Sequence, residues 1–286
     1  MAEIISGKVV SEKLRLELKD SISKFILESG HTPGLAVVLV GDNPASQVYV
    51  RNKHKACLEV GINSYEINLP TETTEEKLLS VIDELNFDSR VDGILVQLPL
   101  PKHIDEERVI NRINPEKDVD AFSPSNVGRI MIGNYTFLPC TPAGVMELLK
   151  HYNIAIEGKN CVVIGRSNIV GKPMAMLLLE KNGTVTVCHS RTQNIVEICR
   201  SADIIVVAVG RAGFLKADMV KPGAVVIDVG INRGDDGKLC GDVAFGEVEK
   251  VASYITPVPG GVGPMTITTL LKNTLSAAKN QMTKIY

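Results

Sequence analysis

The chain has 286 residues, enough for two domains or one large α/β domain, and 44% of them are apolar, enough for a buried core. Charged residues make up 22%, the formal net charge is −2 and the isoelectric point is about 6.2, with no run of Lys or Arg. This balance excludes nucleic acid and anionic membranes as main partners.

The apolar runs are short and the cysteines are scattered. The longest runs, such as 204–209, cannot span a bilayer, and the first residues lack the basic segment and long apolar core of a signal peptide. The six cysteines form no CxxC pair, and the five histidines form no HExxH motif. We therefore expect a soluble cytoplasmic protein with reduced thiols, no metal site and no membrane or nucleic-acid partner.

Taken in chain order, the first half alternates short apolar runs, typical of buried strands, with helical patterns. Strands are expected at 35–40, 62–69 and 93–98, and helices at 45–59 and 74–86. A polar loop follows at 114–137, and a loop of this length favours function over simple connection.

The second half is a denser series of the same kind. Strands are expected at 161–164, 184–188, 203–209 and 224–229, with helical stretches between them. The pattern predicts a doubly wound, Rossmann-like sheet. A turn at 140–142, before a predicted helix at 143–152, marks the boundary. The expected fold is therefore α/β with two domains, 1–140 and 141–264, a cleft between them, and a last helix, 265–286, packing back on the first domain.

Three polar side chains are three and four residues apart on one stripe of the helix predicted at 45–59: Ser46, Tyr49 and Lys53. Taken alone, a helical lysine is most often a surface charge. Gln97 would end a strand at the edge where open α/β sheets bind ligands, although an amide there could simply cap the sheet. Asp118 and Asp120, in the long loop, fit general acid/base work or a metal site, but no third ligand lies near them.

The stretch 162–173 places two glycines where a strand turns into a helix, Gly165 and Gly171. It is not a clean GxGxxG motif, because Ser167 holds the second glycine position, so the match to a dinucleotide-binding turn is weak by itself. Both glycines could also be ordinary turn residues. The position after a strand and before a helix favours the dinucleotide interpretation.

A second strand ends about twenty residues later, at Cys188, where nucleotide-fold enzymes place the residue that reads the ribose. No carboxylate follows it. Ser190 can donate a hydrogen bond there, and Arg166 and Arg191 can pair with a phosphate unless both are solvated surface charges. An acidic residue would repel the extra phosphate of NADP, so its absence favours NADP over NAD.

Residues 257–266, PVPGGVGPMT, hold three prolines and three glycines and cannot continue a helix or a central strand. A helical apolar period resumes at Thr266. We interpret the segment as a rigid extended loop before a helix N-terminus, where a flat ligand can approach the main chain closely. The alternative is a structural turn before a last helix.

Several separated segments together resemble the methylenetetrahydrofolate dehydrogenase/cyclohydrolase family: GDNPASQVYVRNK from residue 41, DGILVQLPLP from 92, LPCTPAG from 138, GRSNIVGKP from 165, CHSRT from 188, and PVPGGVGPMT from 257. The resemblance implies an N-terminal folate-binding, catalytic domain and a Rossmann-like NADP-binding domain. It implies oxidation of methylenetetrahydrofolate with NADP, then hydrolysis of the methenyl form to formyltetrahydrofolate, which serves purine synthesis. A homodimer is expected from the resemblance alone.

The resemblance also assigns roles. The catalytic residues would be Lys53, Tyr49 and Gln97. The substrate would meet Ser46, Tyr49, Asp120, Pro257, Gly260 and Gly261. The cofactor would meet Gly165, Arg166, Ser167, Ser190 and Ile231, to which the phosphate argument adds Arg191.

Asp120 would hold the amino-pyrimidine edge of the pterin, because a carboxylate accepts two parallel N–H bonds. Lys53 would relay protons during hydration, which requires an amine with its pKa lowered toward neutrality. The chain departs from the family's pattern at Ala121, where relatives commonly have glycine, and at Ser123, where many have histidine.

Two other functions fit part of the sequence. A shikimate-dehydrogenase-like enzyme also has two α/β domains and an Arg-Thr pair after the second cofactor strand, but it would lack the PVPGGVGPMT and YVRNK segments. A dinucleotide-binding regulatory or scaffolding protein would have kept the fold and lost the chemistry. The joint presence of Tyr49, Lys53, Gln97 and Asp120 argues against the second alternative.

Overall fold

The computed structural model describes residues 1–234 and 237–283, and this part of the chain forms two compact units. Unit 1 contains Met1–Glu12 and Pro139–Thr266, and unit 2 contains Lys13–Leu138 and the chain from Ile267 onward. The chain passes between the units within α1 (Gly7–Ser29), after Leu138 and within α10 (Val262–Thr283). No helix in the described ranges is long and apolar enough to cross a membrane.

Among the described residues, unit 2 is built on a three-stranded parallel sheet in the order β3-β2-β4. Its strands are β2 (Gly34–Val40), β3 (Asn63–Leu69) and β4 (Gly93–Val96). Every residue of the central strand β2 is buried, as its unbroken apolar run predicts for a parallel strand covered on both faces. Leu35 pairs with Gly93 and Val38 with Val96, so β2 and β4 end at the same edge of the sheet.

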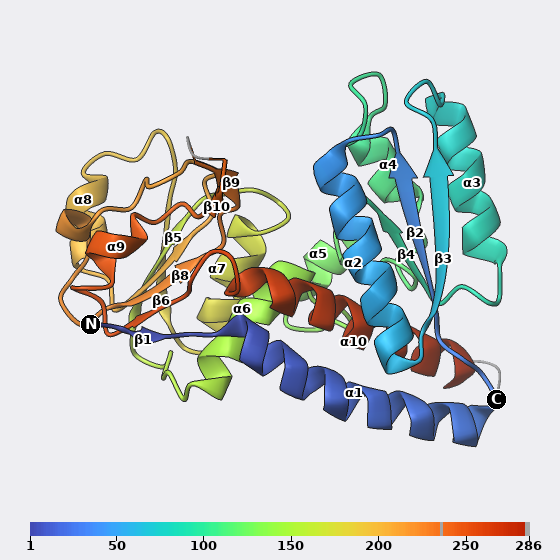
Figure 1. Cartoon of the computed structure of the whole chain (residues 1–286), viewed down its shortest axis with the longest axis horizontal. Coiled ribbons are helices and arrows are strands. Elements are labelled where there is room, and N and C mark those ends of the chain that lie inside the picture. Colours follow the sequence, from blue (N-terminus) through green and yellow to red (C-terminus); the bar gives the residue numbers. More distant parts are fainter. Residues whose placement is uncertain (235–236, 284–286) are drawn as a thin grey trace. The chain divides into compact units, whose positions relative to one another are not determined.

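The helices that follow these strands are α2 (Pro44–Val60), α3 (Glu75–Phe87), α4 (Glu106–Arg112) and α5 (Pro124–Met131). Helix α2 packs along β2 and β3, and α3 packs against α4 (Figure 1). The buried apolar core of this unit includes Val38, Leu78, Ile82 and Ile94. The expected strands and helices of the first half are present, with small differences at their ends.

The stretch 114–137, expected to be a loop throughout, contains α5. Ser123 is the N-cap of this helix, and its Oγ accepts a hydrogen bond from the backbone N–H of Asn126. Pro124 takes the first helical position, where its missing N–H removes no hydrogen bond. A helix of two turns is too short to show a clear apolar period, and for this reason the pattern of the sequence did not reveal it.

The described part of unit 1 contains a six-stranded sheet in the order β1-β11-β8-β7-β5-β6, with parallel ladders throughout. The strands are β1 (Glu3–Ile4), β5 (Asn160–Ile164), β6 (Thr184–Cys188), β7 (Ile204–Val207), β8 (Val225–Asp228) and β11 (Tyr254–Ile255). After β5 the chain adds β6 on one side and β7 on the other. The sheet is therefore doubly wound, and its switch point lies at the carboxyl ends of β5 and β7.

The other elements of unit 1 are α6 (Cys140–His151), α7 (Gly171–Glu180), α8 (Ile195–Arg200), the 3-10 turn η1 (Ala217–Met219), the antiparallel pair β9 (Asn232–Arg233) and β10 (Leu239–Cys240), and α9 (Phe245–Val248). Figure 1 shows β5, β6 and β8 in the yellow and orange part of the chain, and β7 lies between β5 and β8 in the sheet. The core of the sheet includes Ile164, Ile205, Val207, Val226 and Ile255.

Helix α10 begins at Val262, inside the PVPGGVGPMT segment and earlier than the apolar period indicated. Pro264 therefore lies in the first turn of this helix. A proline is tolerated there because the first N–H groups of a helix have no partner within the helix.

Candidate active site

The start of α2 is held by a side-chain cap. The Oδ1 atom of Asn43 accepts hydrogen bonds from the backbone N–H groups of Ala45 and Ser46, at 3.0 and 3.1 Å, and Pro44 occupies the first turn. Such a cap satisfies N–H groups that the helix itself leaves unpaired. The cap fixes the position of Ser46, whose side chain is buried just after the carboxyl end of β2.

Tyr49 and Lys53 lie on the same stripe of α2. Lys53 is only 8% exposed, and Tyr49 is half-buried. Burial raises the pKa of the Tyr49 hydroxyl above its ordinary value of 10.0, so the group stays neutral and can donate or accept a hydrogen bond. Because lysine is almost never buried without a partner, Lys53 is not a solvated surface charge.

Gln97 holds the buried amine. Its backbone N–H donates to the oxygen of Val38 and so continues the sheet beyond β4. Its side-chain Nε2 donates to the oxygen of Leu98 at 2.7 Å, and this bond turns Oε1 toward Lys53. The Nζ atom of Lys53 donates to that Oε1 at 2.9 Å. The amide therefore contacts the candidate catalytic amine in addition to extending the sheet through its backbone.

The two aspartates of the 117–120 segment have different environments. Asp118 is 2% exposed, and its carboxylate accepts from the backbone N–H groups of Phe122 and Ser123 and from Nδ2 of Asn126. A carboxylate used in this way orders the loop and is not presented to a ligand. Asp120 is half-buried, so part of the residue is accessible to solvent.

Ala121 has a left-handed backbone, with φ of 57°, and its side chain is fully buried. Glycine adopts this conformation without a steric penalty, while a residue with a Cβ atom costs about 1–2 kcal/mol there. The departure from the family's common glycine therefore leaves the turn after Asp120 in the geometry that a glycine would favour.

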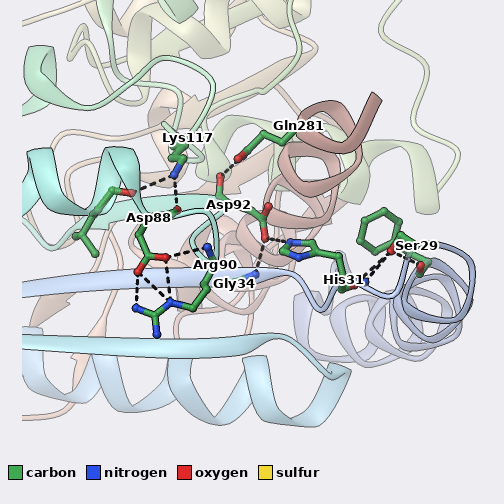
Figure 2. A network of polar contacts seen from close by, with 10 residues as sticks. Ser29, His31, Gly34, Asp88, Arg90, Asp92, Lys117 and Gln281 are labelled. Carbon is green, nitrogen blue, oxygen red and sulfur yellow. Dashed lines mark hydrogen bonds and ion pairs between the residues drawn. The ribbon is translucent and has the colours of Figure 1, made fainter. Parts of the chain in front are cut away.

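Lys117 anchors the beginning of the same segment. Its Nζ donates to the backbone oxygens of Leu85 and Asp88, at 3.0 and 2.8 Å, at the C-terminal end of α3 (Figure 2). Burial lowers the pKa of this amine. Three residues before Asp120, the chain is thus tied to the end of a helix, and no pattern in the sequence indicated this.

A second anchor lies at the amino ends of β2 and β4. The buried carboxylate of Asp92 accepts from the backbone N–H of Gly34 and pairs with Nε2 of His31, each at 2.8 Å, and the backbone oxygen of Asp92 accepts from Gln281 (Figure 2). Burial raises the pKa of Asp92. These contacts hold the edge of the sheet opposite to Gln97, so we assign them a structural role.

In unit 1 the turn from β5 into α7 is tightly packed. A Cβ atom on Gly165, whose φ is 130°, would meet the backbone oxygen of Ala208 at 2.3 Å, and one on Gly171 would meet the oxygen of Gly165 at 2.2 Å. The Oγ atom of Ser167 accepts from the N–H groups of Val170 and Gly171. Both glycines are thus required by close backbone approach, while Arg166 and Ser167 are exposed beside the start of α7.

After β6 the chain forms a short turn. The N–H of Arg191 donates to Nδ1 of His189, and the N–H of His189 donates to Oγ1 of Thr192. Ser190 and Arg191 are exposed on this turn, and no carboxylate is part of it. The residues present therefore fit a dinucleotide with a phosphate on its ribose, since two arginines and a hydroxyl are suitable donors for it.

The prolines and glycines of 257–261 form a packed turn. A Cβ atom on Gly261 would meet the oxygen of Pro257 at 2.4 Å, and one on Gly7 would meet the oxygen of Gly261 at 1.7 Å. Gly260, with φ of 101° and open space around it, accepts from the N–H of Lys8 through its backbone oxygen. Gly261 is thus explained by packing against the start of α1, while Gly260 has room beside it.

The predicted residues divide between the two units. Unit 2 contains Ser46, Tyr49, Lys53, Gln97 and Asp120, and unit 1 contains Gly165, Arg166, Ser167, Ser190, Arg191, Ile231, Pro257, Gly260 and Gly261. Among residues 1–234 and 237–283, no group of three or more His, Cys, Asp or Glu side chains is arranged to hold a metal ion. Fold and site together define an α/β protein with a doubly wound dinucleotide unit and a second unit that carries a buried lysine.

Comparison with known proteins identifies the family. The family model "Tetrahydrofolate dehydrogenase/cyclohydrolase, catalytic domain" matches residues 5–120, and "Tetrahydrofolate dehydrogenase/cyclohydrolase, NAD(P)-binding domain" matches residues 139–282. The chain belongs to the tetrahydrofolate dehydrogenase/cyclohydrolase family.

Individual relatives agree with the family models. The chain is 63% identical over 280 residues to the bifunctional protein FolD of Acetivibrio thermocellus, covering 98% of each protein. The FolD crystal structure from Campylobacter jejuni has a TM-score of 0.96 at 53% identity, covering 98% of this chain and 100% of that one. A FolD structure from Trypanosoma brucei, complexed with NADP cofactor and inhibitor, has a TM-score of 0.94 at 41% identity, covering 98% of each chain.

Proposed function

We propose that the residues of unit 2 bind the folate and carry out its hydration, and that unit 1 binds NADP. The enzyme oxidises methylenetetrahydrofolate to methenyltetrahydrofolate with NADP, and it hydrolyses the methenyl form to formyltetrahydrofolate. We assign the folate-binding, catalytic domain to 1–140 together with the C-terminal helix, and the NADP-binding domain to 141–264. The observation that carries the proposal is the buried amine of Lys53, held by the neutral amide of Gln97.

The NADP site is proposed at the switch point of the unit 1 sheet. The glycine turn after β5 lets a dinucleotide approach the main chain, and Ser190, Arg166 and Arg191 supply donors for the ribose and its phosphate. Ile231, 48% exposed after β8, would meet the nicotinamide end. NADP supplies the hydride acceptor when it is bound. The protein's contribution to oxidation is mainly positioning, because a nitrogen lone pair of the substrate itself expels the hydride.

Lys53 is the proposed proton relay for hydration. A water oxygen forms a bond to the methenyl carbon, and the amine of Lys53 takes the first proton that this water loses. The bond from that carbon to one ring nitrogen then breaks as the oxygen forms the formyl C=O and releases its remaining proton to solvent, and Lys53 returns the first proton to the nitrogen. Gln97 holds the amine by a hydrogen bond and adds no charge of its own, and Tyr49, one helical turn earlier, shields and orients it.

Asp120 is the proposed anchor of the pterin, and Ser46 and the 257–261 turn are further proposed contacts of the folate. The support for Asp120 is its place in the loop. Lys117 and Asp118 hold the segment through backbone groups, and the half-buried Asp120 carries a carboxylate, the group that accepts two parallel N–H bonds from an amino-pyrimidine edge.

Neither alternative function remains. Both family models match, which a shikimate-dehydrogenase-like chain would not explain. A scaffolding protein without chemistry has no reason to keep an amine buried against an amide, since an unneeded buried lysine lowers stability.

An assay with Lys53→Met tests the proposal. The variant keeps the aliphatic bulk and removes the amine, so we expect cyclohydrolase activity to collapse while NADP-dependent dehydrogenase activity survives at least in part. Both rates are followed by absorbance with methylene- and methenyltetrahydrofolate as substrates. A matched control is Lys55→Met, an exposed lysine of the same helix, which should leave both rates unchanged. An unchanged ratio of the two rates in Lys53→Met would rule out the relay.

We also propose a homodimer and a cytoplasmic location. In the described part of the sheet β6 is a terminal strand, it is largely exposed, and Val187 on it is 37% exposed. An exposed edge strand with apolar side chains is a ready site for pairing with another chain. Sedimentation of the purified protein tests the dimer, and a charged substitution, Val187→Lys, should weaken it.

All six cysteines are free, which fits a reducing compartment.

A further inference from the structure

Two buried carboxylates lie near the carboxyl ends of strands in unit 1. Asp228 ends β8 and is 3% exposed, and Asp242 follows β10 and is fully buried. A charge buried in this way is stable only if hydrogen-bond donors replace the water that it loses. The donors that surround the two carboxylates therefore show what the carboxylates hold in place.

Asp242 collects the backbone of the loop after β7. Its Oδ2 accepts from the N–H groups of Val209 and Gly210, at 2.7 and 3.0 Å, and its Oδ1 accepts from the N–H of Arg211 at 2.8 Å. Three successive N–H groups that converge on one point form an anion-binding nest. In this chain the nest is filled by the protein's own carboxylate.

The loop after β8 is held by both aspartates. Oδ1 of Asp242 also accepts from Nδ2 of Asn232 at 2.9 Å, and Oδ1 of Asp228 accepts from the N–H of Gly230 at 2.9 Å. Ile231 lies between these two anchored residues and is 48% exposed. The two carboxylates thus fix the backbone on each side of an exposed apolar side chain.

The glycine turn after β5 rests on the same network. Gly165 lies so close to Ala208 that a Cβ atom on it would meet the Ala208 oxygen at 2.3 Å, and Ala208 directly precedes the nest. Gly230 leaves just as little room, because a Cβ atom on it would meet Cγ of Asp242 at 2.2 Å. Asp242 therefore binds the loops after β7 and β8 directly, and it supports the loop after β5 through Ala208.

We propose that Asp242 is a positioning residue for the NADP site, because it sets the loop on which the glycine turn rests and the loop that presents Ile231. The inference rests on the proposed function, since it takes the carboxyl edge of this sheet as the cofactor site. Asp242 acts through the backbone and touches neither the substrate nor the reacting atoms.

Asp242→Asn tests the proposal. The amide has the shape of the carboxylate but turns one acceptor into a donor, which then faces N–H groups of the nest. We expect the Kd for NADP, measured by calorimetry, to rise about tenfold, the equivalent of losing one charge-assisted hydrogen bond. Hydrogen exchange at the amides of 209–211 should become faster without cofactor. The dissociation constant for folate should stay unchanged.

A matched control separates positioning from general loss of stability. Asp92 of unit 2 is equally buried and also accepts a backbone N–H, that of Gly34. Asp92→Asn should lower the unfolding temperature but leave the Kd for NADP unchanged. If Asp242→Asn does not fold, Asn232→Ala replaces it in the test. This variant removes only the hydrogen bond between Asp242 and the loop after β8, and it should also raise the Kd for NADP.

Ile231→Ala distinguishes failure of this inference from failure of the proposed site. Wild-type NADP affinity in a folded Asp242→Asn protein overturns the inference, and it does so most directly if Ile231→Ala weakens binding. Loss of affinity in Asp242→Asn together with wild-type affinity in Ile231→Ala supports positioning through the nest and removes Ile231 from the proposed cofactor contacts.

Discussion

The Nζ atom of Lys53 donates a hydrogen bond to Oε1 of Gln97 at 2.9 Å, and the two residues lie 44 positions apart in the chain. The pairing joins a buried stripe of α2 to the end of β4. The amide of Gln97 adds no negative charge of its own, and this distinguishes the pair from an ordinary salt bridge, in which a carboxylate favours the ammonium form more strongly. A base that must take a proton from water benefits from such a partner.

Replacing that partner by a carboxylate should impair hydration. In Gln97→Glu a negative charge next to Lys53 favours the ammonium form, so the pH midpoint of cyclohydrolase activity should move up by about one unit or more. The rate at pH 7 should fall about tenfold or more as a result. The pH profile of each activity is the measurement. A Gln97→Glu profile that coincides with that of the wild type would show that the amide does not tune the lysine.

Arg191→Ala should narrow the preference for NADP. The exposed arginine follows β6 with no carboxylate beside it, so its loss removes a phosphate partner and should raise the KM for NADP about tenfold. The KM for NAD should change little, because NAD lacks that phosphate. Arg90→Ala, an exposed arginine of unit 2 paired with Asp88, is the control. Equal specificity constants for the two cofactors in the wild type would remove the basis of this prediction.

Asp120→Asn should weaken folate binding, whereas Asp118→Asn should mainly lower the stability of the fold. Asp120→Asn places a donor against donors of the pterin, so folate affinity should fall by several kcal/mol, by order of magnitude about 3. Asp118→Asn places a donor against the N–H of Ser123, so the free energy of unfolding should fall more than the folate affinity does. Calorimetric folate binding and urea-induced unfolding of both variants separate the effects. Near-native folate affinity in Asp120→Asn would reduce Asp120 to a loop residue.

Gly261 and Gly263 flank the first residue of α10, and replacing each by alanine should change the stability in opposite directions. Gly261→Ala forces a Cβ atom against the oxygen of Pro257 and should cost about 3 kcal/mol, because backbone must move. Gly263→Ala has open space, lies within α10, and should stabilise by up to about 1 kcal/mol. Urea-induced unfolding measures both. Equal stability of the two variants would contradict the packing described for the 257–261 turn.

Asp228 should make stability depend on pH. Burial raises its pKa from 3.8 to about 6 in the folded protein, so the folded state keeps a proton that the unfolded state has already lost. The stability that this proton contributes is fully present below pH 3.8 and is lost as the pH rises through about 6. The free energy of unfolding of the wild type, relative to Asp228→Asn, should therefore fall by roughly 3 kcal/mol between these limits and then stay constant. A flat difference would show that Asp228 keeps its ordinary pKa.

Much of the fold follows from local patterns. The apolar run of β2 and the series from β5 to β8 predict parallel strands, because strands covered on both faces must be apolar along their whole length. Helix α5 escaped detection since two turns carry too weak a period.

The site divides in the same way. The sequence by itself determined the family through its motifs. It also showed that no carboxylate follows Cys188. Both are properties of residues that are neighbours in the chain. Only the tertiary structure decided that Lys53 is buried against Gln97, that Asp118 serves its own loop, and that Asp242 fills a backbone nest. Each of these depends on which donors and acceptors folding brings within about 3 Å, and spacing along the chain does not specify that distance.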